Sequence, residues 1–274
     1  MYLINITEPS QSLIGCNCKI KQSMKQYFFI IAIAVFISPF FSSAQEDAKD
    51  ILTKSEEYLR GTTNIAEMKM TIIRPKWTRE MQMKVWSIGD TYSLIYMKAP
   101  KRDEGTTFLK RDKEIWNWVP SIERVVKMPP AMMLQSWMGS DFTNDDLVRG
   151  SSIIDDYDHK VIGEENVEGK DCYVIELIPK PEAPIVWGKV KNWISKEDYL
   201  QLKIEFYDED DFLVNTMAMT EIKDLGGKTF PTKMMIIPEE DPENKTLIEY
   251  IDMEFDAPLE ESFFTVNSMK RIRE

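Results

Sequence analysis

The chain has 274 residues and a formal net charge of −12, with 46 acidic against 34 basic side chains. A surface this acidic repels phosphate backbones and anionic headgroups, which argues against binding to nucleic acid or to a membrane surface. One histidine and three cysteines also argue against a zinc or copper site and a disulfide framework.

The first 44 residues have the pattern of an export signal behind a short leader. Met24 opens a basic region, residues 27–41 are almost wholly apolar, and small residues end at Ala44. An apolar core of about 15 residues is short for a membrane span, which needs roughly 20. We therefore predict translation from Met24 and cleavage after Ala44, with an uncleaved anchor as the alternative. The mature chain, residues 45–274, is long enough for one domain with a real core.

Residues 47–60 have the pattern of an amphipathic helix. Ile51, Leu52 and Leu59 share one face, acidic residues crowd the first turn, and Gly61 follows the end.

After this helix, apolar and polar residues alternate, which is typical of half-buried strands. Short turns such as Gly89-Asp90 and Gly226-Gly227 favour antiparallel hairpins. So many strands must curl or close. We predict a mainly β (α+β) fold with a strongly curved antiparallel sheet, or unclosed barrel, of about eleven strands. The strand-like runs are residues 68–72, 81–85, 92–96, 116–128 as a hairpin, 152–162, 171–178, 188–195, 200–207, 212–223, 229–238 and 246–255.

Residues 131–147 interrupt this strand pattern after Pro129-Pro130. The segment is too apolar all round for a surface helix, so it must cover something. We predict a helical lid whose side chains face a cavity in the curved sheet, and residues 139–143 turn the chain back. The alternative is that these methionines fill the core in the ordinary way, since this flexible side chain fits irregular gaps. The candidate ligand-binding residues are Met132, Met133, Leu134, Trp137, Met138 and Phe142.

Catalytic patterns are missing from the sequence. His159 stands beside acidic residues that read as a solvated turn, without the spacing of a calcium loop. Neither a nucleophile elbow nor a phosphate-binding glycine loop occurs. We therefore predict no catalytic residue, no metal and no cofactor. An apolar cavity closed by a lid would instead suit an acyl chain, whose burial is worth on the order of 10 kcal/mol.

The sequence resembles the LolA-like outer-membrane lipoprotein-sorting proteins over essentially all of the mature chain. Parts of this resemblance are carried by residues 169–173, 187–190, 193–194, 200–207 and 263–265. Its most specific part is the run from Gly139 to Thr143 after an aromatic-proline hairpin. The matching motif residues, for which the resemblance implies a structural role, are Trp116, Trp118, Pro120, Arg124, Gly139, Ser140, Asp141, Thr143 and Asp146.

This resemblance implies an unclosed β-barrel with a lid, located in the periplasm, that binds lipid or lipoprotein acyl chains without catalysis. It implies a monomeric carrier that takes cargo from an inner-membrane exporter towards an outer-membrane acceptor. The alternative is a non-catalytic periplasmic module that docks on an envelope transporter through residues 131–147.

One departure concerns the arginine before a proline that latches the lid in the family. Lys98-Ala99-Pro100 stands at the place where we expect it. Arg124, Arg149 and Asp141 are the alternative candidates for a bond across the lid.

Overall fold

The computed structural model describes residues 46–112, 114–133, 135–146, 153–183 and 185–272. The predicted start at Met24 and the cleavage site after Ala44 lie outside the described residues. Within these ranges, no helix is long and apolar enough to cross a membrane.

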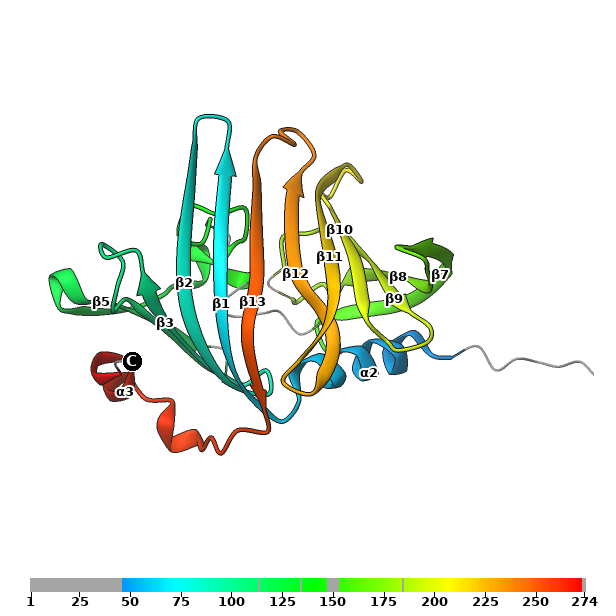
Figure 1. Cartoon of the computed structure of the whole chain (residues 1–274). Coiled ribbons are helices and arrows are strands. Elements are labelled where there is room, and N and C mark those ends of the chain that lie inside the picture. The colour runs from blue at the N-terminus through cyan, green and yellow to red at the C-terminus, as the bar shows by residue number, and fades with distance from the viewer. Residues whose placement is uncertain (1–45, 113, 134, 147–152, 184, 273–274) are drawn as a thin grey trace, which may run out of the picture. The chain divides into compact units, whose positions relative to one another are not determined.

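Thirteen strands form one antiparallel sheet in the order β6-β5-β4-β3-β2-β1-β13-β12-β11-β10-β9-β8-β7 (Figure 1). The last strand of the chain pairs with the first, while β6 and β7 form the two edges, so the sheet stays open. The strands are β1 Thr63–Arg74, β2 Trp77–Ile88, β3 Tyr92–Ala99, β4 Thr107–Arg111, β5 Glu114–Val119, β6 Arg124–Lys127, β7 Tyr157–Val167, β8 Lys170–Pro179, β9 Lys189–Ser195, β10 Gln201–Tyr207, β11 Leu213–Leu225, β12 Lys228–Pro238 and β13 Lys245–Phe255.

The predicted count of about eleven strands was too low, and β4 is a strand that the sequence pattern did not indicate. It is only five residues long, and two of them are the basic residues Lys110 and Arg111. Both faces of β4 are nevertheless buried, because Phe108 joins the core on the concave side and Leu109 packs on the convex side. Alternation between apolar and polar residues is lost when both faces are covered.

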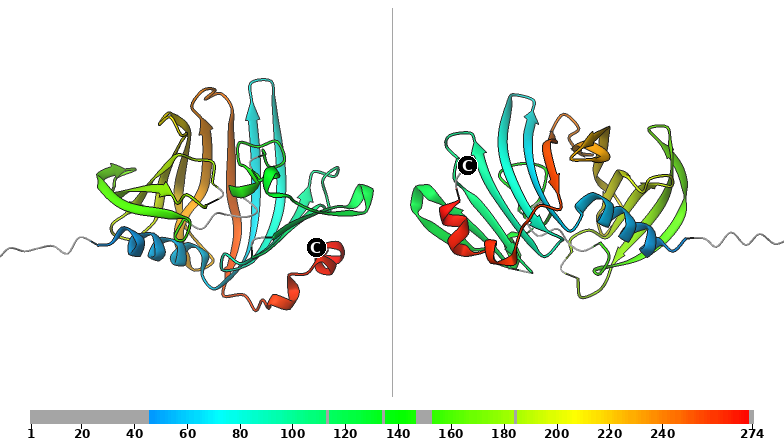
Figure 2. Two further views of the ribbon diagram at one scale, coloured as in Figure 1. Left: turned by 180° about the vertical axis from the view of Figure 1, so that it is seen from behind. Right: turned by 60° about the horizontal axis from the view of Figure 1, so that its bottom comes forward.

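Helix α2, Ala48–Arg60, agrees with the predicted helix. Asp47 caps its first turn by accepting a hydrogen bond from the backbone N–H of Lys49, and the helix ends at Gly61, whose φ is +63°. Ile51 and Leu52 are fully buried against the sheet. Figure 2 shows α2 lying across one end of the curved sheet.

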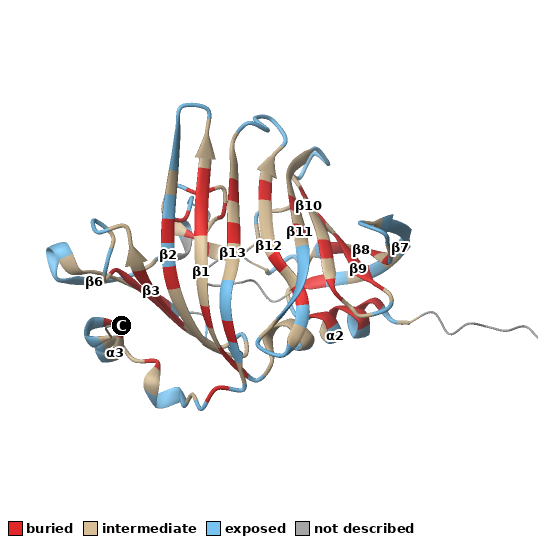
Figure 3. Ribbon diagram, viewed as in Figure 1, coloured by how far each residue is buried: buried red, intermediate tan, exposed pale blue. Residues whose placement is uncertain are grey.

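The concave face of the sheet holds the largest apolar core. Met70 and Ile72 of β1, Met81 of β2 and Met97 of β3 are fully buried there. In Figure 3, buried positions gather along the strands, while the hairpin tips are exposed.

The C-terminal segment covers part of the convex face. After β13, the 3₁₀ turn η4, Glu261–Phe263, leads to helix α3, Val266–Arg271. Phe264 and Met269 are fully buried against Leu94 of β3 and Leu109 of β4. The backbone carbonyl of Met269 also accepts a hydrogen bond of 2.9 Å from the Thr107 hydroxyl. The short final element predicted at residues 262–266 is therefore part of a longer strap that ends in a helix.

The pairing between β12 and β13, near the middle of the sheet, is short for strands of this length. Only the residues from Lys233 to Ile236 pair with β13, although β12 has 11 residues. Ile251 is bulged out of the register of β13 with β1, and Pro231 has no N–H to donate. Gly226 instead packs on the β13 backbone, where an added Cβ would lie 2.2 Å from the Met253 carbonyl oxygen. We call this boundary the β12–β13 seam.

Candidate functional site

A cavity of about 350 Å³ lies on the concave side of the sheet. Its walls come from strands on both sides of the seam, and most of the lining side chains are apolar: aliphatic, methionine and aromatic. Contributing residues from the central strands are Met68, Met83, Ile95, Met217, Met234 and Ile248.

One end of this cavity is polar. Glu56 and Arg60 of α2 contribute to the lining there, and they form an ion pair with an N–O distance of 2.6 Å. Asp90 and Lys110 also line the cavity, and the Lys110 ammonium donates to the Asp90 backbone carbonyl. The cavity therefore combines an apolar body with charged groups at one end, which suits an amphiphile.

Residues 128–133 and 135–146, which follow β6, lie on the concave side of the sheet, and we call residues 128–146 the crossing loop (Figures 1 and 2). The expected helical lid is present only in part in the described residues of this loop. The 3₁₀ turn η2, Pro130–Met132, is followed by turns and a β-bridge between Ser136 and Thr143, and residues 144–146 are helical. Met138 and Gly139 both have positive φ values, +54° and +82°, so the chain reverses there as predicted.

Two of the six candidate ligand-binding residues line the cavity. Trp137 is fully buried and Phe142 is 1% exposed, and both contribute to the wall. Met133 is buried in the same core, and Met138 packs against it. Met132 is partly exposed in the 3₁₀ turn, and Leu134 lies outside the described residues.

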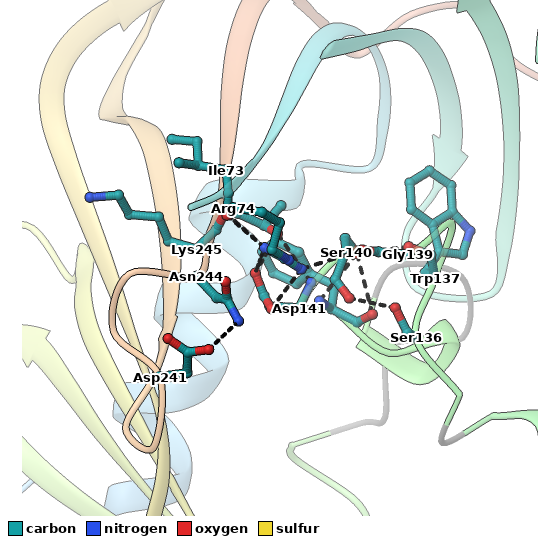
Figure 4. A network of polar contacts seen from close by, with 12 residues as sticks. Ile73, Arg74, Ser136, Trp137, Gly139, Ser140, Asp141, Asp241, Asn244 and Lys245 are labelled. Carbon is teal, nitrogen blue, oxygen red and sulfur yellow. Dashed lines mark hydrogen bonds and ion pairs between the residues drawn. The ribbon is translucent and has the colours of Figure 1, made fainter. Parts of the chain in front are cut away.

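An ion pair holds the crossing loop on the sheet (Figure 4). Arg74, the last residue of β1, donates to both carboxylate oxygens of Asp141, at 2.9 and 3.0 Å. The hydroxyl of Thr246 in β13 donates to the same carboxylate at 2.7 Å and accepts from the Asp141 backbone N–H at 3.1 Å. The two charged side chains are only 15% and 11% exposed, so this pair lies largely out of water.

A second arginine on the same hairpin supports the loop. Arg79 of β2 donates to the backbone carbonyl of Met138 at 3.1 Å and to the Asp103 carboxylate at 2.6 Å. Of the three residues expected to bond across the lid, Asp141 does so. Its partner Arg74 was not predicted from the sequence. A signal was available, because Arg74 directly precedes Pro75. Arg124 is exposed in edge strand β6, and Arg149 lies outside the described residues.

The remaining loop residues of the motif form local hydrogen bonds. The Ser140 hydroxyl donates to the Trp137 carbonyl at 2.8 Å, which closes the turn around Gly139. The Asp146 carboxylate accepts from the backbone N–H and the hydroxyl of Thr143, both at 2.8 Å. Asp146 also lines the cavity, and burial raises the pKa of its carboxyl.

Two residues that line the cavity each have a buried polar atom without a hydrogen-bond partner among the described residues. These atoms are the Asn192 Oδ1 atom of β9 and the Trp137 Nε1 atom of the crossing loop. Neither was singled out in the sequence for its polar group.

The described ranges contain no group of side chains arranged as a metal site, that is, no group of three or more His, Cys, Asp and Glu side chains that could hold a metal ion. The ring of His159 contacts the backbone carbonyl of Ile153, with a Nε2–O distance of 2.6 Å.

Comparisons with known proteins agree with this geometry. A family model described as "-like: Uncharacterized protein" matches residues 89–271. A crystal structure from Vibrio parahaemolyticus, described as an outer membrane lipoprotein-sorting protein domain, is 25% identical with a TM-score of 0.73. The match covers 82% of this chain and 98% of that one. The chain belongs to the family that this model describes, and it is similar to LolA-like lipoprotein-sorting domains.

Two further structures share the LolA-like fold. A DUF1329 family protein from Desulfovibrio piger is 25% identical, covering 81% of this chain and 97% of that one, with a TM-score of 0.73. A LolA superfamily protein from Nitrosomonas europaea is 20% identical, covering 81% and 99%, with a TM-score of 0.70. No match was found among curated protein sequences.

The LolA-like motif residues of the β5–β6 hairpin lie apart from the cavity. Trp116 and Trp118 of β5 pack on the convex face against the C-terminal strap, on the side opposite Ile115, which faces the core. Pro120 begins the 3₁₀ turn η1, Pro120–Ile122, and contacts Gly105, where an added Cβ would lie 3.3 Å from the ring. This part of the motif supports the fold.

Proposed function

We propose that this LolA-like protein is a periplasmic carrier that shelters the acyl chains of a lipid or lipoprotein during transport towards the outer membrane. In this proposal it acts without catalysis, receives cargo from an inner-membrane exporter and delivers it to an outer-membrane acceptor.

The apolar cavity behind the crossing loop is the observation that carries the proposal. Its volume of about 350 Å³ falls in the usual range for ligand pockets, roughly 300–1,000 Å³. A buried methylene contributes about 0.8 kcal/mol, so an acyl chain gains on the order of 10 kcal/mol from such a site. The Vibrio parahaemolyticus relative, described as a lipoprotein-sorting domain, supports the same class of cargo.

The alternative is a module that docks on an envelope transporter through Met132, Met133 and Trp137. Burial disfavours it, because Trp137 is fully buried and Met133 is 5% exposed. A docking surface needs accessible apolar side chains in the unbound protein.

The carrier function can be tested with a variant that narrows the cavity. Ser87 of β2 and Ser93 of β3 lie opposite each other in the sheet, and both line the cavity. Because Ser87 is only partly buried, Ser87→Trp should fill free space near the polar end rather than crowd a packed core. We expect it to weaken uptake of a fluorescent fatty-acid probe by about tenfold or more, equivalent to about 1.4 kcal/mol.

Gln82→Trp is the matched control, because Gln82 is exposed on the same strand and does not line the cavity. Its probe affinity should equal that of the unchanged protein.

Lipid extraction and native mass spectrometry of protein purified from its own envelope should show bound acyl species. Protein that carries none and also takes up no probe contradicts the carrier function.

A further inference from the structure

A row of polar side chains crosses the concave face of the sheet at one end of the cavity. Its members are direct cross-strand neighbours on β1 to β4, in the order Asn64, Ser87, Ser93 and Lys110. All four residues line the cavity, and we call them the polar row. Side chains opposite each other on adjacent strands have Cβ atoms about 4.5–5.5 Å apart. Neighbours in the row can therefore contact one small group.

The polar row borders an apolar surface. The next concave positions along the same strands are again cross-strand neighbours, and all of them are apolar: Ala66, Val85, Ile95 and Phe108. The first three line the cavity as well. Two residues of a strand span roughly 7 Å, so the wall changes from hydrogen-bonding groups to hydrocarbon over a short distance. This arrangement fits the junction between the head group and the acyl chain of a lipid.

The accessible part of the polar row is its middle. Asn64 and Lys110 at the two ends are 8% and 7% exposed, whereas Ser87 and Ser93 are only partly buried. Neither serine hydroxyl has a hydrogen-bond partner among the described residues. Since a hydroxyl both donates and accepts hydrogen bonds, two adjacent groups of the cavity wall can bind a ligand.

Lys110 brings a positive charge to this end of the cavity. It faces the concave side, like Phe108 two positions earlier on β4, which joins the main core. Its ammonium donates to the backbone carbonyl of Asp90, which lies in the turn between β2 and β3. Ser87 and Ser93 stand at the ends of the strands that this turn joins. Ammonium and hydroxyl groups both donate hydrogen bonds to oxyanions.

Three acidic residues of the cavity lining would repel an anion, and the effect of each is weakened. Glu56 is paired with Arg60 at an N–O distance of 2.6 Å. Asp90 is exposed, so water and salt screen its carboxylate. Asp146 belongs to the crossing loop, and burial raises the pKa of its carboxyl. Lys110 therefore sets the sign of the charge that the polar row prefers.

We propose that the polar row binds the head group of the carried lipid, and that this head group is an oxyanion, either a phosphate or a carboxylate. The inference rests on the proposed carrier function and specifies its cargo. The hydroxyls of Ser87 and Ser93 donate to the oxygens of the head group, and Lys110 stabilises its negative charge. The acyl chain lies along the neighbouring apolar positions.

Three ligands with chains of equal length test this preference: laurate, dodecyl phosphate and methyl laurate, which carries no charge. Each is measured by displacement of a fluorescent fatty-acid probe from delipidated protein, and the affinity of the probe is determined separately for every variant. We expect at least one of the two anions to bind about tenfold more tightly than methyl laurate, equivalent to about 1.4 kcal/mol. The anion that binds more tightly distinguishes a phosphate site from a carboxylate site.

Two variants remove the hydroxyls and the charge separately. The double change Ser87→Ala and Ser93→Ala should weaken the preferred anion about fivefold to tenfold and leave methyl laurate unchanged, because only the anion loses charge-assisted hydrogen bonds. Lys110→Met keeps the length of the side chain and should have the same effect through loss of the charge. Thr220→Ala is the control, because Thr220 lies on the face of β11 opposite Met219 of the core. It should change none of the three affinities.

Equal affinity for all three ligands in the unchanged protein, or an undiminished preference for the anion in either variant, overturns the inference and leaves the carrier function standing. If Lys110→Met does not fold, the double serine variant decides the question, because it removes only two oxygen atoms from a partly exposed surface. If the unchanged protein takes up neither the probe nor any of the ligands, the carrier function fails along with the inference.

Discussion

The Asp141 carboxylate attaches the crossing loop to the sheet through an ion pair and a hydrogen bond. It is bound by the Arg74 guanidinium and the Thr246 hydroxyl, which come from adjacent strands β1 and β13. Both charged groups are mostly withdrawn from water. Removing one partner of such a pair leaves the other charge desolvated and uncompensated, which costs more than the intact pair contributes.

We expect Asp141→Ala to lower the free energy of unfolding by about 3 kcal/mol, because the Arg74 charge stays in place without its carboxylate. The loss should be measured by denaturant unfolding. Limited proteolysis should also cut residues 128–146 faster than in the unchanged protein, since the variant loses contacts with both strands.

Lys127→Ala is a suitable control because it removes an ion pair from the neighbouring β5–β6 hairpin. Lys127 and Glu114 are both about half exposed, so this change should lower the free energy of unfolding by less than about 1 kcal/mol. An Asp141→Ala variant as stable as the control would show that the buried pair does not hold the loop.

At the scale of the elements, the C-terminal strap forms a second layer on part of the convex face of the sheet. Phe264 is its anchor, packed against Leu94 and Leu109, with its ring 5.7 Å from that of Tyr92. The strap covers strands β3 to β5, which lie towards one edge of the open sheet. Its removal would expose apolar residues on strands that have few other partners on that face.

Phe264→Ala should therefore lower the free energy of unfolding by about 3–5 kcal/mol, the usual cost of truncating a fully buried phenylalanine. Calorimetry or denaturant unfolding measures this loss. Phe212→Ala is the control, because Phe212 is 69% exposed and its removal should change stability by about 0.5 kcal/mol or less. Equal stability of the two variants would contradict the anchoring role of Phe264.

For the molecule as a whole, the sequence predicted the elements whose burial is one-sided. Helix α2 and the long alternating strands were found because an apolar face repeats at a fixed period. Strand β4 and helix α3 were missed, since β4 is buried on both faces and α3 is a single short turn-and-a-half packed on the convex side.

The site was predictable only in part for a related reason. An apolar segment such as the one holding Trp137 and Phe142 signals burial, and both residues do line the cavity. Polar partners are set by three-dimensional proximity instead. Arg74 lies 67 positions before Asp141, and Asn192 reads in the sequence as an ordinary polar residue of a strand.

The β12–β13 seam has a mechanical consequence for a protein whose contents must enter and leave. Four paired residues join one half of the sheet, β1–β6 with β13, to the other half, β7–β12. The cavity draws its walls from both halves. If each half of the sheet moves as a rigid unit, bending at the seam widens the cavity. This movement breaks only the few hydrogen bonds between β12 and β13.

Hydrogen exchange should reveal this compliance. We expect the amides of residues 228–230 and 232, which have no pairing with β13, to exchange faster than those of residues 68–72, which pair on both sides. Occupation of the cavity by a fatty-acid probe should slow exchange at the seam, because the ligand then contacts both halves. Uniformly slow exchange across the seam would mean that the sheet is one rigid body, and that cargo must pass by the crossing loop alone.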